Sequence, residues 1–134
     1  MVNYYDEIIS DAHKFRHAIE KARSDVRFTD RMKYFPRGCC DDSSELFAFY
    51  LKNKGIQAIE VTGEIENQKH VWLELGELVV DMTADQFCGK GIYCGPYNDF
   101  YNSWKIVKKE SPFDISQHQN LSKDYEIIKT YLND

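Results

Sequence analysis

Residues 70–83 read HVWLELGELVVDMT, two apolar runs separated by Gly76-Glu77. A glycine-containing pair between two such runs is typical of a two-residue hairpin loop. The stretch therefore predicts antiparallel strands over 70–75 and 78–82. A helical pattern precedes these strands, and helices followed by consecutive strands favour the α+β class, with an antiparallel sheet packed on the preceding helix.

The short loop also fixes which side chains share a face of the hairpin. If Leu75 pairs with Leu78, directly opposed residues lie on one face. Counting back places one set together: His70, Trp72, Asp81 and Thr83. The opposite face is wholly apolar and is expected to face the core: Val71, Leu73, Leu75, Leu78, Val80 and Met82. His70 and Asp81 become diagonal neighbours, roughly 7–8 Å apart at the backbone, which their side chains can bridge by a hydrogen bond.

A second stretch, residues 35–44, reads FPRGCCDDSS and runs into an apolar-periodic segment. Pro36 and Gly38 predict a tight loop, and the acidic and hydroxyl residues after Cys40 suit the first turn of a helix. We predict a helix over about 40–53 that stops at Gly55. The unpaired amides and the dipole of a helix start favour a thiolate, although cysteine is also a small residue that is commonly buried.

Cysteine, histidine and aspartate fit one mechanism. A thiol needs a nearby base to be nucleophilic at neutral pH, and histidine has a suitable pKa. A carboxylate then orients the imidazole and stabilises its charged form. The hypothesis makes Cys40 the nucleophile, His70 the base and Asp81 the orienting residue, with a thioester intermediate and the Cys40 amide as an oxyanion donor.

The three motifs together resemble a known family. Gly38-Cys39-Cys40 before a helix, the His-x-Trp-x-Glu run from His70, and the Asp-x-Thr run from Asp81 are similar to bacterial members of the transglutaminase-like branch of the papain-like cysteine protease superfamily. The resemblance covers roughly residues 35–87. It implies a cysteine-bearing helix packed on an antiparallel sheet that carries histidine and aspartate, and it favours Cys40 over Cys39 as the nucleophile. Asp41-Asp42 stands where related sequences commonly have Gly-Asp.

The resemblance implies a hydrolase or acyltransferase of peptidase, amidase or transglutaminase type, without a cofactor. Its substrate would be a peptide, a protein or another amide. We expect Trp72, beside the histidine, and Gln86, after the second strand, to contact the substrate. The alternative is a catalytically inactive module that binds a peptide or protein through the face around Trp72 and the aromatic loop at 93–101.

The remaining chain is expected to complete a single domain over residues 1–134. Periodicity predicts helices over 3–24 and 122–132. A connecting loop is expected at 25–38, a strand at 57–65, a polar turn at 66–69 and a short strand at 103–107. Residues 83–103, rich in glycine and aromatic residues, are predicted to be irregular.

Composition narrows the function classes. The net charge of −5 argues against a nucleic-acid partner, and no apolar run approaches the roughly 20 residues of a membrane span. The start of the sequence lacks the pattern of a signal peptide, so we expect a cytoplasmic protein with reduced thiols. The spacing of the four cysteines does not indicate a zinc site, and His13 and His17, one helical turn apart, are expected on the solvated surface.

Overall fold

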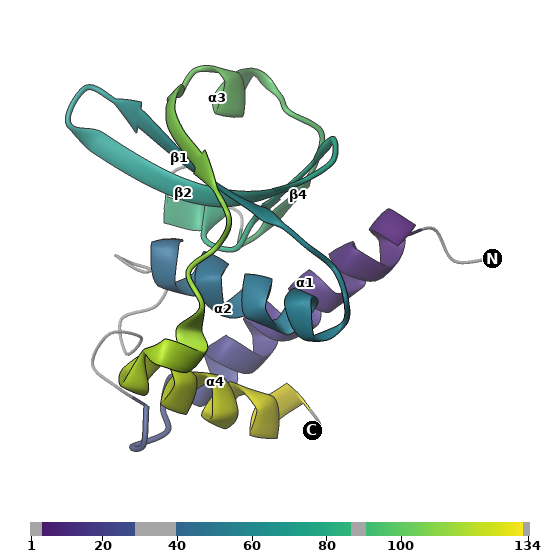
Figure 1. Cartoon of the computed structure of the whole chain (residues 1–134), viewed down its shortest axis with the longest axis vertical. Coiled ribbons are helices and arrows are strands. Elements are labelled where there is room, and N and C mark those ends of the chain that lie inside the picture. Colours follow the sequence, from purple (N-terminus) through teal and green to yellow (C-terminus); the bar gives the residue numbers. More distant parts are fainter. Residues whose placement is uncertain (1–3, 29–39, 87–90, 133–134) are drawn as a thin grey trace.

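The computed structural model is a mixed α+β fold in which a sheet lies on a layer of helices (Figure 1). It describes residues 4–28, 40–86 and 91–132, with the backbone alone for Cys40, Asp41 and Gln86. In chain order the elements of these residues are α1 (Tyr4–Ala22), α2 (Cys40–Asn53), β1 (Ile59–Ile65), β2 (Gln68–Leu75), β3 (Leu78–Asp81), the 3-10 turn η1 (Ala84–Gln86), β4 (Tyr93–Gly95), α3 (Asp99–Asn102), β5 (Lys105–Glu110), the 3-10 turn η2 (Ile115–Gln117) and α4 (Gln119–Leu132).

The sheet is antiparallel throughout, in the order β4-β3-β2-β1-β5. The β2–β3 hairpin has the predicted register, with Leu75 opposite Leu78 and Leu73 opposite Val80. β1 pairs with β2 so that Gly63 lies opposite His70. The central position of β2 buries the hairpin on both faces, which explains why its strands contain so few polar side chains.

Each face of the sheet carries its own apolar layer. On the lower face in Figure 1, α1 and α2 pack against one set of strand side chains, and α4 packs beneath α1. The strand residues of this layer include Leu73, Leu75, Leu78, Val80 and Met82, as the alternation in the sequence predicts. On the upper face a smaller layer lies under α3: Val61, Trp72, Val79, Tyr101 and Trp104. One face therefore makes the main core, and the other makes an aromatic layer.

Helix α2 has the predicted bounds, Cys40–Asn53, and its C-terminal end is encoded locally. Gly55 takes a left-handed conformation, with φ of 83°. The amide of Ile56 donates to the carbonyl of Leu51 and the amide of Gly55 donates to that of Lys52, a pattern that ends a helix cleanly. The apolar stripe of the helix, with Leu46, Phe47 and Leu51 buried, then fixes its rotation against the sheet.

Most predicted elements are confirmed, and the differences fall at the ends of elements and in the glycine-rich loop. The polar turn predicted at 66–69 is wrong in its bounds, because β2 begins at Gln68 and Glu66 takes a positive φ of 54° in a two-residue turn. The irregular loop predicted for 83–103 contains η1, β4 and α3. The last helix begins at Gln119, where the ring of His118 accepts a hydrogen bond from the Leu121 amide. Within the described ranges, no helix has both the length and the apolar character needed to cross a membrane.

A glycine in β1 makes room for the aromatic layer. A Cβ built on Gly63 would lie 2.9 Å from the Cβ of Trp104 and 2.9 Å from the indole of Trp72, closer than side chains approach in proteins. We predict that Gly63→Ala lowers the free energy of unfolding by about 1–3 kcal/mol, because overpacking forces both indoles to move. Urea denaturation measures this change. Glu64→Ala, at the next and exposed position, is the control and should change stability by less than about 0.5 kcal/mol. An equal loss in the two variants would contradict the close packing at Gly63.

Candidate active site

His70 and Asp81 meet in the upper layer of the sheet. The imidazole Nε2 of His70 lies 2.7 Å from Oδ2 of Asp81, and both side chains have 0% exposure. The predicted contact between them is thus present, and it depends on the hairpin register, since a one-residue slip would place the two side chains on opposite faces. What the pair does chemically remains a prediction.

Three groups of the described residues contact the carboxylate of Asp81. Besides His70, the hydroxyl of Tyr101 donates to Oδ2 at 2.7 Å, and the backbone amide of Thr83 donates to Oδ1 at 3.1 Å. A carboxylate that accepts several hydrogen bonds is stabilised in its ionised form, and an ionised carboxylate only accepts. Asp81 therefore accepts hydrogen bonds from the Tyr101 hydroxyl and the Thr83 amide, and its Oδ2 also lies within hydrogen-bond distance of the His70 Nε2.

Aromatic rings enclose the imidazole. The ring centroid of His70 lies 5.9 Å from that of Trp72 and 5.8 Å from that of Trp104. Trp72 itself is fully buried, and its indole nitrogen donates to the hydroxyl of Tyr97, which in turn donates to Glu74. Trp72 was predicted to contact a substrate, but its indole has no exposed surface through which it could do so. In the structure this residue packs against the histidine and orders Tyr97.

The helix that carries Cys40 packs on the strand that carries His70. α2 contacts β2 through the lower face of the sheet, whereas the imidazole lies on the upper face. Figure 1 shows α2 starting at the same end of the sheet where β2 begins and β3 ends. The start of α2 and the His70–Asp81 pair thus occupy one end of the sheet. The side chains of Cys40 and Gln86, and the whole of Cys39, lie outside the described residues.

Cys94 provides a contrast to the proposed nucleophile. It is a free thiol on β4, opposite Val80. Burial, and secondarily the negative charge of Asp81, raise the pKa of the Cys94 thiol to about 12. Because the thiolate is the reactive form, we expect this cysteine to react slowly at neutral pH even though it lies near the pair.

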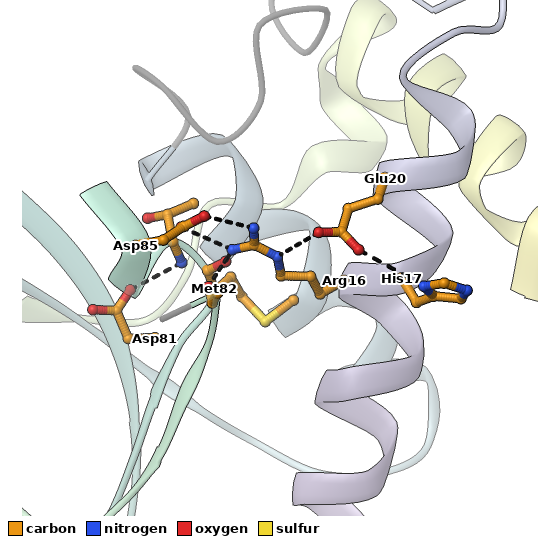
Figure 2. A network of polar contacts seen from close by, with 8 residues as sticks. Arg16, His17, Glu20, Asp81, Met82 and Asp85 are labelled. Atoms are coloured by element: carbon orange, nitrogen blue, oxygen red, sulfur yellow. Dashed lines mark hydrogen bonds and ion pairs between the residues drawn. The ribbon is translucent and has the colours of Figure 1, made fainter. Parts of the chain in front are cut away.

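The segment that follows Asp81 is held from the opposite side by an arginine (Figure 2). Arg16 of α1 is buried, and its guanidinium binds both carboxylate oxygens of Asp85, at 2.9 and 2.8 Å, and the carbonyl oxygen of Met82 at 2.8 Å. It also donates to the carbonyl oxygen of Gly91 and to Glu20. These contacts join α1 to both ends of the β3–β4 connection.

Sequence reasoning missed Arg16 and Tyr101. The sequence does contain an indication of the role of Arg16. This residue interrupts the apolar stripe of its helix between Phe15 and Ile19, and a charged residue at a buried position needs a partner. Tyr101 was recognised only as one of several aromatic residues in a glycine-rich segment, and periodicity does not indicate which of them points toward the sheet.

No metal centre is indicated in the described parts of the chain, since His, Cys, Asp and Glu side chains do not cluster there in groups of three. His13 and His17 are both exposed on α1, as predicted, and His17 lies 3.7 Å from Glu20.

Comparison of the chain with protein-family models, with curated proteins and with solved structures gave no match.

The contacts of Arg16 predict that replacing this residue lowers stability, whereas replacing an exposed charged residue of the same helix does not. Replacing Arg16 by Met removes the donors and leaves Asp85 and two carbonyl groups without their partner, so we expect a loss of about 2–4 kcal/mol in the free energy of unfolding. Amide hydrogen exchange should also speed up between Met82 and Ile92. The control Lys14→Met, at an exposed position of α1, should leave both quantities nearly unchanged. Wild-type exchange rates in Arg16→Met would show that the arginine does not hold this segment.

Proposed function

We propose that the protein is a cysteine enzyme that acts on an amide bond, with Cys40 as nucleophile, His70 as base and Asp81 as the orienting residue. The observation that carries this proposal is the buried hydrogen bond of 2.7 Å between His70 and Asp81. It lies at the end of the sheet where the cysteine-bearing helix begins.

The orientation of the imidazole supports this assignment. With Nε2 bonded to Asp81, Nδ1 is the ring nitrogen that would exchange a proton with a thiol. The carboxylate favours this tautomer and stabilises the imidazolium ion that forms when the thiol loses its proton. Exclusion of water by the rings of Trp72 and Trp104 strengthens the attraction between the two charges.

The proposed reaction proceeds in two steps. His70 takes the thiol proton of Cys40, and the sulfur attacks the carbonyl carbon of the amide. The carbon–nitrogen bond then breaks, the amine leaves with the proton that His70 held, and a thioester remains. Water or a second amine then attacks the thioester and gives its proton to His70. The carbon–sulfur bond breaks, a carboxylic acid or a new amide leaves, and His70 returns the proton to the sulfur of Cys40.

The start of α2 is suited to the charge that develops in both steps. The first amides of a helix have no partner within the helix, and they point along its axis at the positive end of the dipole. In this proposal the backbone amide of Cys40 donates to the oxyanion, and loss of one such donor costs about a hundredfold or more in rate. A helix that begins with a cysteine and packs on a sheet bearing histidine and aspartate also agrees with a papain-like core of the transglutaminase-like type, which we propose as the finer fold assignment.

A second candidate function follows from the complete burial of the pair. Neither His70 nor Asp81 has accessible surface, and a hydrogen-bonded histidine in a dry aromatic layer also serves to specify packing. In this reading the chain is an inactive module of the same architecture that binds a peptide or protein, and Cys40 does not react.

Alkylation by iodoacetamide distinguishes the two functions. We predict that at pH 7 Cys40 of the folded protein reacts at least about tenfold faster than Cys94, because a thiolate paired with an imidazolium forms at neutral pH and the Cys94 thiolate does not. His70→Gln should slow the Cys40 reaction by about a hundredfold, as expected when the base is lost. Peptide mass spectrometry measures the rate at each cysteine.

Two cysteine variants complete this experiment. Cys40→Ser should abolish the fast reaction, whereas Cys39→Ser should keep it. A fast reaction that survives in Cys40→Ser and disappears in Cys39→Ser would move the nucleophile by one residue. Equal rates at all four cysteines, unaffected by His70→Gln, would reject the enzyme and favour the binding module.

A further inference from the structure

We propose that Tyr101 is a positioning residue for the His70–Asp81 pair and sets the proton affinity of the imidazole through the shared carboxylate oxygen. This inference rests on the proposed function for its catalytic consequence. It concerns a side chain on α3, 20 residues after Asp81 in the sequence and outside the three motifs.

The hydroxyl of Tyr101 bonds to the same carboxylate oxygen as His70. It donates to Oδ2 of Asp81 at 2.7 Å, and Oδ2 is also the atom that lies 2.7 Å from Nε2 of His70. Oδ1 is held separately by the amide of Thr83. The tyrosine and the histidine therefore compete for one oxygen, whereas the backbone fixes the other.

Local structure delivers this hydroxyl to a fixed place. Asn98 caps α3 by accepting a hydrogen bond from the Tyr101 amide, at 3.0 Å, through its side-chain oxygen. The ring of Tyr101 packs edge-on against Trp72, with centroids 5.2 Å apart, and against Phe100, with centroids 4.9 Å apart. It is buried, and a phenylalanine would fill the same space. Packing alone thus does not require the hydroxyl, which would be costly to bury without an acceptor.

Because His70 and Tyr101 share Oδ2 of Asp81, the tyrosine affects the charge that the imidazole meets. A donor to Oδ2 draws off part of the negative charge that the imidazole meets, so the carboxylate stabilises the imidazolium form less than it would alone. Among the described residues, the ionisable groups that bond to this carboxylate or lie beside it are His70 on β2, Tyr101 on α3 and Cys94 on β4. The pKa of Cys94 is raised to about 12, so its thiol stays neutral and does not titrate with His70. Tyr101 is therefore the described neighbour whose removal acts on the His70–Asp81 charge balance directly.

The test is an NMR titration of the His70 ring in the folded protein. Tyr101→Phe removes the hydroxyl and keeps the ring. We expect the titration midpoint of His70 to rise by about one pH unit, a tenfold gain in proton affinity, which is the scale of one charge-assisted hydrogen bond. A purely structural role would change stability without moving this midpoint.

Tyr93→Phe is the matched control. The Tyr93 ring packs on Tyr101 with centroids 5.1 Å apart, but its hydroxyl donates to the carbonyl oxygen of Pro96 and has no bond to Asp81. This variant should leave the His70 midpoint within about 0.2 unit of the wild type, since the charges at the pair are unchanged. Equal midpoints in Tyr101→Phe and the wild type, or equal shifts in both variants, would overturn the proposal.

A second substitution keeps the proposal testable if Tyr101→Phe does not fold. 3-Fluorotyrosine at position 101 retains the ring and the hydroxyl but makes the hydroxyl a stronger donor. It should lower the His70 midpoint, opposite to the effect of phenylalanine. A midpoint that rises or stays constant with fluorotyrosine would also reject the proposal.

The outcome for Tyr101 is separable from that for Cys40. If Cys40 reacts no faster than Cys94 and the His70 midpoint still shifts in Tyr101→Phe, the enzyme is rejected and the positioning role stands. If Cys40 reacts rapidly through His70 and the midpoint does not shift, the enzyme stands and the positioning role is rejected.

Discussion

A buried carboxylate constrains the upper half of this molecule. Asp81 lies at the end of β3 with no accessible surface, and an ionised carboxylate removed from water costs several kcal/mol unless its lone pairs are filled. Three elements supply the donors: β2 through His70, the turn after β3 through Thr83, and α3 through Tyr101. The hairpin register, the turn and the position of α3 must all be correct at once for the charge to be satisfied. Such a requirement selects one arrangement of the aromatic layer.

The segment from Asp81 to Asp85 is where the two layers of the fold meet. From above, its first carboxylate binds the histidine and the tyrosine, and from below, its last carboxylate binds Arg16 of α1 (Figure 2). The carbonyl of Met82 between them is also bound by Arg16. α1 therefore helps to position Asp81, although none of the described hydrogen bonds of Asp81 is to a residue of α1. A short stretch of chain fixed from both sides suits catalytic geometry, because small displacements of an orienting residue cost rate.

Local patterns in the sequence predicted the parts of the site that lie in regular structure. The Gly76-Glu77 loop fixed the register, and the register alone placed His70 and Asp81 on one face within reach of each other. The C-terminal end of α2 followed from Gly55, whose left-handed conformation ends the helix, for a similar local reason. Contacts that join segments distant in sequence did not follow. Tyr101 reaches Asp81 only because α3 folds back over the sheet, and Arg16 reaches Asp85 across 69 residues. Composition marked the aromatic segment as unusual but did not indicate which ring meets the carboxylate.

In the proposed enzyme, the sulfur of Cys40 and the Nδ1 atom of His70 meet at the end of the sheet where α2 begins. A crystal structure of the protein after stoichiometric alkylation by iodoacetamide tests it most directly, because the adduct marks the reactive sulfur and the density locates the ring. We expect the adduct on Cys40, with the sulfur in contact with the imidazole and the His70–Asp81 hydrogen bond intact. An adduct on another cysteine, or packed side chains between the Cys40 sulfur and the imidazole, would contradict it.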